Sequence, residues 1–158
     1  MICDPFETLA EAAPRPGALM GLDLGTETIG VAVSDSFQSV ATPLETIRRK
    51  KFGIDADRLL AIAENRTIKG IVLGLPLNMD GSEGPRCQST RAFARNLTAR
   101  TALPIAFWDE RLSTVAAERA LLEADTTRKR RGEVIDHVAA SYILQGALDR
   151  LAHLGHGS

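Results

Sequence analysis

Short apolar segments, separated by glycine, proline and charged residues, run through most of the chain. The segments ALMGLDLG and TIGVAVSD, divided by Gly25, Thr26 and Glu27, predict two strands of a hairpin in which glycine takes the strained turn position. A third run, ATPLETIRR, extends the meander. The pattern therefore predicts three consecutive antiparallel strands from Ala18 onward.

Segments with helical and strand character alternate after this meander. The spacing predicts helices over 54–64 and from Pro85, each followed by a short buried strand, IKGIVLGLP and then 104–108. A further helix is capped by Ser113 or Thr114, and a final helix follows. The residues expected to share one face of the helix from Pro85 are Cys87, Thr90, Ala94 and Leu97. The apolar residues of the final helix are Ile135, Val138, Ala139, Tyr142, Ile143 and Gly146.

This order of elements predicts an α/β fold with a mixed five-stranded sheet and flanking helices, which is the strand order of a ribonuclease H-like fold. A length of 158 residues with 44% hydrophobic residues indicates one domain with a substantial core. We expect residues 1–17 to form a flexible N-terminal extension, residues 18–152 the domain, and residues 153–158 a C-terminal tail.

Charge and cysteine content narrow the class of protein. The chain has 19 Lys and Arg against 20 Asp and Glu, so its net charge is −1, which excludes a histone-like binder with a global positive field. The two basic runs, 48–51 and 128–131, indicate local polyanion sites, and solvated loops are the alternative for each.

The longest stretch without charged residues is 137–148, too short for a transmembrane helix. Two cysteines and no secretory signal favour the reducing cytoplasm.

Asp23 is the first candidate for chemistry. It lies in an apolar strand, with Leu22 and Leu24 on one face and its own carboxylate on the other. A half-buried carboxylate needs a compensating partner, and the glycines at 21 and 25 leave room for an anionic ligand such as a metal-held phosphate. The alternative is a carboxylate that accepts hydrogen bonds at the hairpin turn.

Further carboxylates follow the last predicted strand and begin the last predicted helix. Asp109 and Glu110 emerge at the C-terminal edge of the sheet, where mixed α/β proteins build sites, and the sequence leaves open which of the two faces a ligand. Glu110 could instead pair with Arg111 or Arg119. Asp136 is expected in the first turns of the final helix, where the helix dipole alone would favour an acid.

A site composed of Asp23, Glu110 and Asp136 would offer only oxygen ligands, which suit Mg²⁺ or Mn²⁺ better than zinc. The three histidines, His137, His153 and His156, are expected to be non-catalytic. Convergence of the carboxylates is inferred from the order of strands, since they are far apart in the chain.

The segments GLDLGTETIGVAVSD, IVLGLPLNMDGSEG, WDERLSTVAAERALLEAD and IDHVAASYILQGALD together resemble the YqgF/RuvX family, the pre-16S rRNA nucleases related to Holliday junction resolvases. The resemblance runs from about Leu19 to Leu151. It implies a ribonuclease H-like fold, divalent-metal phosphodiester hydrolysis with Asp23, Glu110 and Asp136 as catalytic residues and metal ligands, and a cytoplasmic role in maturing the 5′ end of 16S rRNA. The chain departs from the family at Glu27, where lysine is common.

Pre-16S rRNA is the expected substrate, gripped through its phosphates by Arg128, Lys129, Arg130 and Arg131 and by the turn at Asn78. DNA junctions and ribosomal proteins are further candidate partners, a membrane is not, and monomer and homodimer both stay open. The alternatives are a Holliday junction resolvase acting on DNA, which would need a dimer, and a catalytically weak RNA-binding ribosome-assembly factor. An ATP-binding module is disfavoured, because the chain lacks the length for a second domain.

Overall fold

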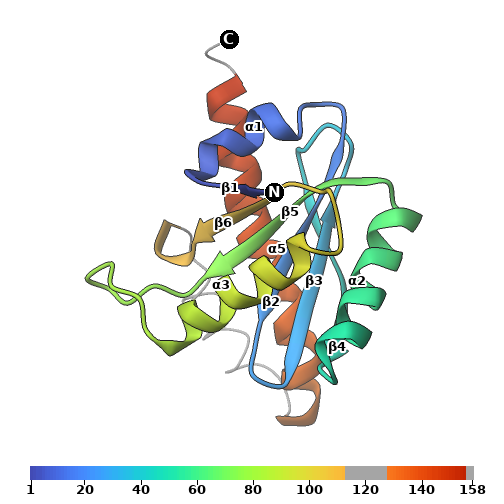
Figure 1. Ribbon diagram of the computed structural model, residues 1–158, viewed down its shortest axis with the longest axis vertical. Coiled ribbons are helices and arrows are strands. Elements are labelled where there is room, and N and C mark those ends of the chain that lie inside the picture. Colours follow the sequence, from blue (N-terminus) through green and yellow to red (C-terminus); the bar gives the residue numbers. More distant parts are fainter. Residues whose placement is uncertain (113–127, 156–158) are drawn as a thin grey trace.

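The computed structural model describes residues 1–112 and 128–155, with the side chains of 1–112 and 136–154. A twisted sheet lies at its centre, with helices on both faces (Figure 1). The predicted helix capped by Ser113 or Thr114 lies outside the described residues, as does His156. In the part of the chain that is described, no helix is long and apolar enough to cross a membrane.

Six strands form the sheet in the order β1-β6-β5-β2-β3-β4. Strands β2, β3 and β4 form an antiparallel meander, whereas β5 joins β2, and β6 joins β5, in parallel. The sheet is therefore mixed, as the sequence predicts. The strands are β1 (Ile2–Cys3), β2 (Ala18–Leu24), β3 (Thr28–Ser34), β4 (Ala41–Arg48), β5 (Ile68–Leu75) and β6 (Ile105–Asp109).

The β2–β3 turn differs from the expected one. Gly25 does not adopt a positive φ, and its amide instead donates a hydrogen bond to the carbonyl oxygen of Thr28 at 2.8 Å. Thr26 and Glu27 have no positive φ either, so this turn does not use the left-handed conformation that favours glycine. The prediction that glycine takes a strained conformation at this turn is therefore wrong.

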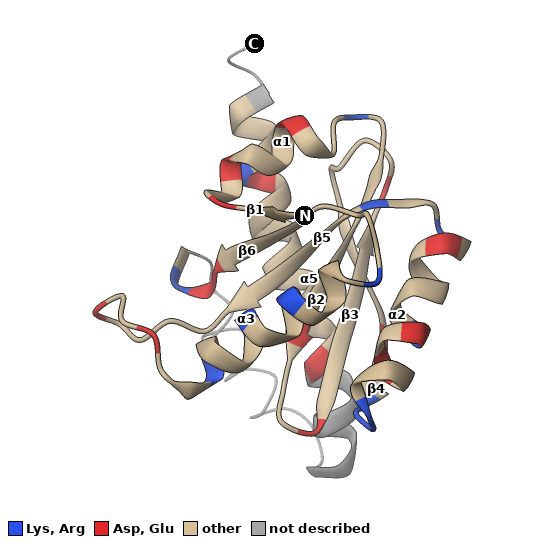
Figure 2. Ribbon diagram, in the orientation of Figure 1, with Lys and Arg blue, Asp and Glu red and all other residues tan. Residues whose placement is uncertain are grey.

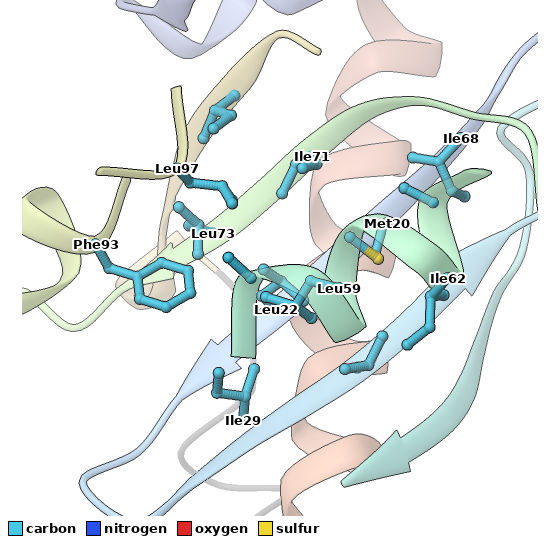
Figure 3. Packing of buried hydrophobic residues seen from close by; sticks show 14 of the residues in the cluster. Met20, Leu22, Ile29, Leu59, Ile62, Ile68, Ile71, Leu73, Phe93 and Leu97 are labelled. Atoms are coloured by element: carbon cyan, nitrogen blue, oxygen red, sulfur yellow. The ribbon is translucent and has the colours of Figure 1, made fainter. Parts of the chain in front are cut away.

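Helices α2 (Phe52–Asn65) and α3 (Pro85–Thr98) cover one face of the sheet, and α5 (Arg128–Gly155) crosses the other. Pro85 occupies the first turn of α3, and the face predicted for this helix is buried. Figure 3 shows the apolar cluster between the sheet, α2 and α3. Its labelled members are Met20, Leu22, Ile29, Leu59, Ile62, Ile68, Ile71, Leu73, Phe93 and Leu97.

The first 17 residues are packed on the domain and do not extend from it. Ile2 and Cys3 pair in parallel with β6, and so add a sixth strand to the five that we predicted. A 3-10 turn, η1 (Phe6–Thr8), and α1 (Leu9–Ala12) follow. Leu9 is fully buried in the α5-side core. A two-residue strand carries no readable alternation, which is why the sequence does not predict it.

Helix α5 is longer than predicted at both ends. It begins at Arg128, so the basic run 128–131 forms its first turn and is not a loop. It ends at Gly155, so residues 153–155 of the predicted tail are helical. Asp136 consequently lies in the third turn of α5. The helix dipole therefore does not explain an acidic residue at position 136, since the effect of the dipole falls off within the first turn.

Candidate active site

The carboxylate of Asp23 is buried near the end of β2, where only 6% of the residue is exposed. Leu22 and Leu24 belong to the core under α2 and α3, as their alternation predicts. Gly21 faces α5, because a Cβ at this position would lie 2.7 Å from Cβ of Leu144. Residues two apart on a strand share a face, so Asp23 also lies on the α5 side.

Asp136 reaches this region because α5 lies against the backbone of β3. Gly30 is the cross-strand partner of Asp23, and a Cβ at position 30 would lie 1.9 Å from the carbonyl oxygen of Asp136. No residue larger than glycine permits this approach. The third turn of α5 is thereby placed directly over the strand neighbour of Asp23.

Hydrogen bonds orient the two polar residues of this turn. Oγ1 of Thr28 donates to Oδ2 of Asp136 at 2.5 Å, so the carboxylate is fixed at the start of β3. Nδ1 of His137 lies 2.8 Å from Oγ1 of Thr46 on β4. This second contact gives His137 a structural role in docking α5 against the sheet.

Glu110 opens the 3-10 turn η2 (Glu110–Leu112) directly after β6. Its carboxyl carbon would lie 3.4 Å from a Cβ built at Gly74, whose α5 side is also contacted by Ile143. Gly74 follows Leu73, which pairs with Leu22, so Gly74 lies beside Asp23 in the parallel β2–β5 ladder. The carboxyl group of Glu110 therefore reaches the strand on the other side of Asp23.

Asp109, the neighbouring candidate, is engaged elsewhere. Its carboxylate accepts hydrogen bonds from the backbone amide and the guanidinium of Arg111, at 2.8 to 3.2 Å. The Arg111 side chain holds the pKa of Asp109 below its ordinary value. The same guanidinium donates to the carbonyl oxygen of Met79 at 3.3 Å, and thereby ties the β5–α3 loop to β6. Arg119, the other partner predicted for Glu110, lies outside the described residues.

The structure thus brings Asp23, Glu110 and Asp136 to one face, over adjacent positions of β2, β5 and β3. Their carboxylates are the ligand type that Mg²⁺ and Mn²⁺ prefer. Within the described ranges, however, no three His, Cys, Asp or Glu side chains are grouped closely enough to hold a metal ion. The donor set fits such an ion in kind, and binding would have to draw the carboxylates together.

The predicted nucleic-acid contacts lie on different elements, the loop between β5 and α3 and the start of α5. Asn78 closes its own turn, because its backbone amide donates to the carbonyl oxygen of Ser82 and its Nδ2 donates to Oγ of Ser82, both at 3.0 Å. The hydroxyl and amide of Ser82 in turn lower the pKa of Asp80. The basic run 128–131 begins α5, on the helix that carries Asp136. Its side chains are not among those described.

Three residues of this region were not identified from the sequence: Thr28, Gly30 and Gly74. A glycine at alternate positions of neighbouring apolar strands is the signal that could have found the last two. Gly21, which we expected to leave room for a ligand, instead allows α5 to approach. Because Gly21, Gly30 and Gly74 have no side chain, α5 and the carboxyl group of Glu110 can lie close to the sheet.

The fold is ribonuclease H-like and resembles that of the RuvC resolvases. The RuvC of T. thermophilus in complex with a Holliday junction substrate is 12% identical, with a TM-score of 0.56 over 87% of this chain and 96% of that chain. A second structure of T. thermophilus RuvC is 14% identical with a TM-score of 0.52 over the same shares. The predicted fold class is confirmed.

The particular family follows from sequence comparison. Residues 17–150 match the family model "RuvX: Holliday junction resolvase", and the chain belongs to this family. A protein of Ruegeria pomeroyi is 76% identical over 154 residues, 98% of this chain and 100% of that protein. One of Paracoccus denitrificans is 72% identical over 155 residues, 98% of each. Both carry the name "Putative pre-16S rRNA nuclease". The family resemblance seen in the sequence is confirmed.

Proposed function

We propose that this protein is a divalent-metal-dependent nuclease that hydrolyses phosphodiester bonds in the 5′-end maturation of pre-16S rRNA, in the cytoplasm. The observation that carries the proposal is the placement of Asp23, Glu110 and Asp136 on one face of the sheet. The names of the close relatives support pre-16S rRNA as the substrate.

In this proposal Asp23, Glu110 and Asp136 are the catalytic residues and hold Mg²⁺ or Mn²⁺. The ion, when bound, supplies an acidified water and stabilises charge on the leaving oxygen. Asp23 contributes a buried carboxylate between the other two. Thr28 keeps Asp136 oriented through its hydroxyl, and the pairing of Asp109 with Arg111 leaves Glu110 as the second carboxylate of the site.

Recognition would depend on the phosphate backbone. Aromatic residues form only 4% of the chain, so base stacking contributes little. The residues we propose for phosphate contacts are Arg128, Lys129, Arg130, Arg131 and Asn78. Binding through these cations should weaken as salt is raised, and ribosomal proteins are proposed to add specificity.

A second candidate is a resolvase that cuts four-way DNA junctions. It is favoured by the description of the family and by the fold shared with RuvC. Symmetrical cutting would require a homodimer with two suitably placed sites. The two candidates share one chemistry and differ in substrate and oligomeric state.

The test is cleavage of end-labelled pre-16S RNA and of a DNA four-way junction, with Mg²⁺, Mn²⁺ or EDTA. We expect metal-dependent cleavage of the RNA by wild type, and at least a roughly 100-fold loss in Asp23→Asn, since even residues behind metal ligands contribute about 10- to 100-fold. Asp57→Asn, which changes an exposed carboxylate on α2 paired with Arg100, should retain cleavage.

Each other outcome points elsewhere. Preferential cutting of the junction would favour the resolvase. RNA binding without cleavage by a folded wild type would favour a ribosome-assembly factor, and equal cleavage by wild type and Asp23→Asn would refute the proposed site.

A further inference from the structure

A pocket of about 550 Å³ opens at the end of the sheet where β2 stops. Its walls are the β2–β3 turn, the connection between β4 and α2, and the first two turns of α3. Figure 2 shows the basic connection after β4 at the same end of the sheet as the β2–β3 turn. This pocket lies on the α2 and α3 side, opposite the face that bears Asp23.

The lining of the pocket is cationic and rich in hydroxyls. Arg49, Lys50 and Arg86 contribute three positive charges, and Thr26 and Ser89 add hydroxyl groups. Among the described lining residues there is neither a carboxylate nor an aromatic ring. Such a lining suits a phosphate group and offers no platform on which a base could stack.

The two arginines are held in place by the end of β2. Nη1 of Arg49 donates to the carbonyl oxygen of Gly25 at 2.6 Å, and the Arg49 guanidinium lies 5.7 Å from the centre of the Phe93 ring. Nη2 of Arg86 donates to the carbonyl oxygen of Leu24 at 3.3 Å. A guanidinium has five N–H donors, so each of these bonds leaves donors for a ligand. The pocket is thus partly preorganised for an anion.

The pocket is also close to Asp23 along the chain. Leu24 and Gly25, whose carbonyl groups anchor the arginines, directly follow Asp23. Two residues of extended chain span at most about 7 Å. A nucleic acid that crosses this end of β2 would therefore pass the carboxylates on one face of the sheet and the pocket on the other face.

Two of the four cations in the basic run 48–51 line the pocket, and the other two do not. Arg49 and Lys50 line it, whereas Arg48 ends β4 and Lys51 precedes α2, both exposed and outside the lining. The four cations are adjacent in the sequence and differ in their position relative to one cavity. The chain therefore offers a charge-matched control within a single segment.

We propose that this pocket binds a backbone phosphate of the substrate strand, next to the phosphodiester held at Asp23, Glu110 and Asp136. The proposal rests on the proposed function in so far as the strand is the substrate of that site. The pocket then sets the path of the strand over the end of β2. Its ligand is a phosphodiester of a polynucleotide, and not a free nucleotide.

The test measures binding without cleavage. A fluorescein-labelled single-stranded RNA of 20 nucleotides is titrated in EDTA with the full chain, by fluorescence anisotropy at several salt concentrations. We expect Arg49→Gln with Lys50→Gln to weaken binding at least about tenfold and to lower the salt slope by about 1. Arg48→Gln with Lys51→Gln removes the same charge and should weaken binding less than about threefold. Thermal unfolding establishes that both double variants are folded.

Three results would overturn the proposal. Equal losses in the two double variants would mean that only the charge of the segment matters. Saturable binding of AMP that the pocket variant loses, with RNA binding unchanged, would assign the pocket to a free nucleotide. Cleavage with Mg²⁺ is measured separately. If wild type is inactive but its RNA binding depends on the pocket, the nuclease function is refuted and the phosphate pocket is supported. If wild type is active and the pocket variants bind RNA as wild type does, the nuclease function is supported and the phosphate pocket is refuted.

Discussion

Gly30 and Asp136 are in backbone contact: a Cβ at position 30 would lie 1.9 Å from the Asp136 carbonyl oxygen. Because this oxygen belongs to a helix backbone, it cannot rotate away as a side chain would. We expect Gly30→Ala to lower the free energy of unfolding by at least about 3 kcal/mol, the upper range for overpacking. Urea denaturation measures this change.

Gly53→Ala is the matched control. A Cβ at Gly53 would meet only Nη1 of Arg100, at 3.5 Å, and alanine is favoured over glycine in helices by about 0.5–1 kcal/mol. This variant should be as stable as wild type or slightly more stable. Wild-type stability in Gly30→Ala would mean that α5 does not pack on β3 as described.

Glu110 and Asp109 should differ in their effect on cleavage. Glu110→Gln removes the carboxylate that lies over Gly74, and we expect at least a roughly 100-fold loss of metal-dependent activity. Asp109→Asn weakens a contact with Arg111 and should cost less than about tenfold. Single-turnover cleavage of the same RNA measures both, and the reverse order would assign the metal ligand to Asp109.

Thr28 is a positioning residue for Asp136. Thr28→Val keeps the shape of the side chain and removes the hydroxyl that donates to Oδ2 of Asp136. We expect cleavage to fall about 10- to 100-fold and the Mg²⁺ concentration for half-maximal rate to rise. Thr28→Ser restores the donor and should recover most of both. An unchanged Mg²⁺ requirement in Thr28→Val would restrict the residue to a structural role.

Leu9 tests the attachment of the N-terminal segment. It is fully buried against the α5-side core, so Leu9→Ala should destabilise the protein by about 2–5 kcal/mol in urea denaturation. Ile54→Ala on α2, where the residue is 52% exposed, should change stability by about 0.5 kcal/mol or less. Equal, small effects would support a segment that does not contribute to the core.

The Asp109–Arg111 pair predicts a pH dependence of stability. Arg111 holds the pKa of Asp109 below the ordinary value of 3.8, so the pair stabilises the fold above that pH and the contribution disappears as pH falls through the lowered pKa. With these side chains 21% and 33% exposed, solvent screening should keep this contribution small. Urea midpoints of wild type and Asp109→Asn should therefore differ at pH 6 and converge near pH 2. A constant difference would contradict this.

Much of the fold is written in local patterns. The alternation of Leu22, Asp23 and Leu24 places the carboxylate on the correct face of β2, and Pro85 marks the start of α3. By contrast, the two residues of β1 are too few to show a period. The start of α5 was misplaced because Arg128–Arg131 has no apolar residue from which a helical period could be read.

The candidate site is less visible in the sequence because it depends on contacts between distant segments. Nothing near Asp109 or Glu110 shows which of the two is taken by Arg111. Likewise, no local pattern indicates that Gly30 admits the backbone of Asp136. The residue types were predictable and their relative positions were not, since helix packing decides the latter.

Because Asp136 belongs to the last helix, it is the last of the three carboxylates to be added during synthesis of the chain. A chain translated as far as residue 127 already contains Asp23 and Glu110, but neither α5 nor its carboxylate. The set of three is assembled only after α5 has emerged and packed on Gly30. A nascent chain therefore lacks the complete carboxylate set until its last helix has been made and has packed on the sheet.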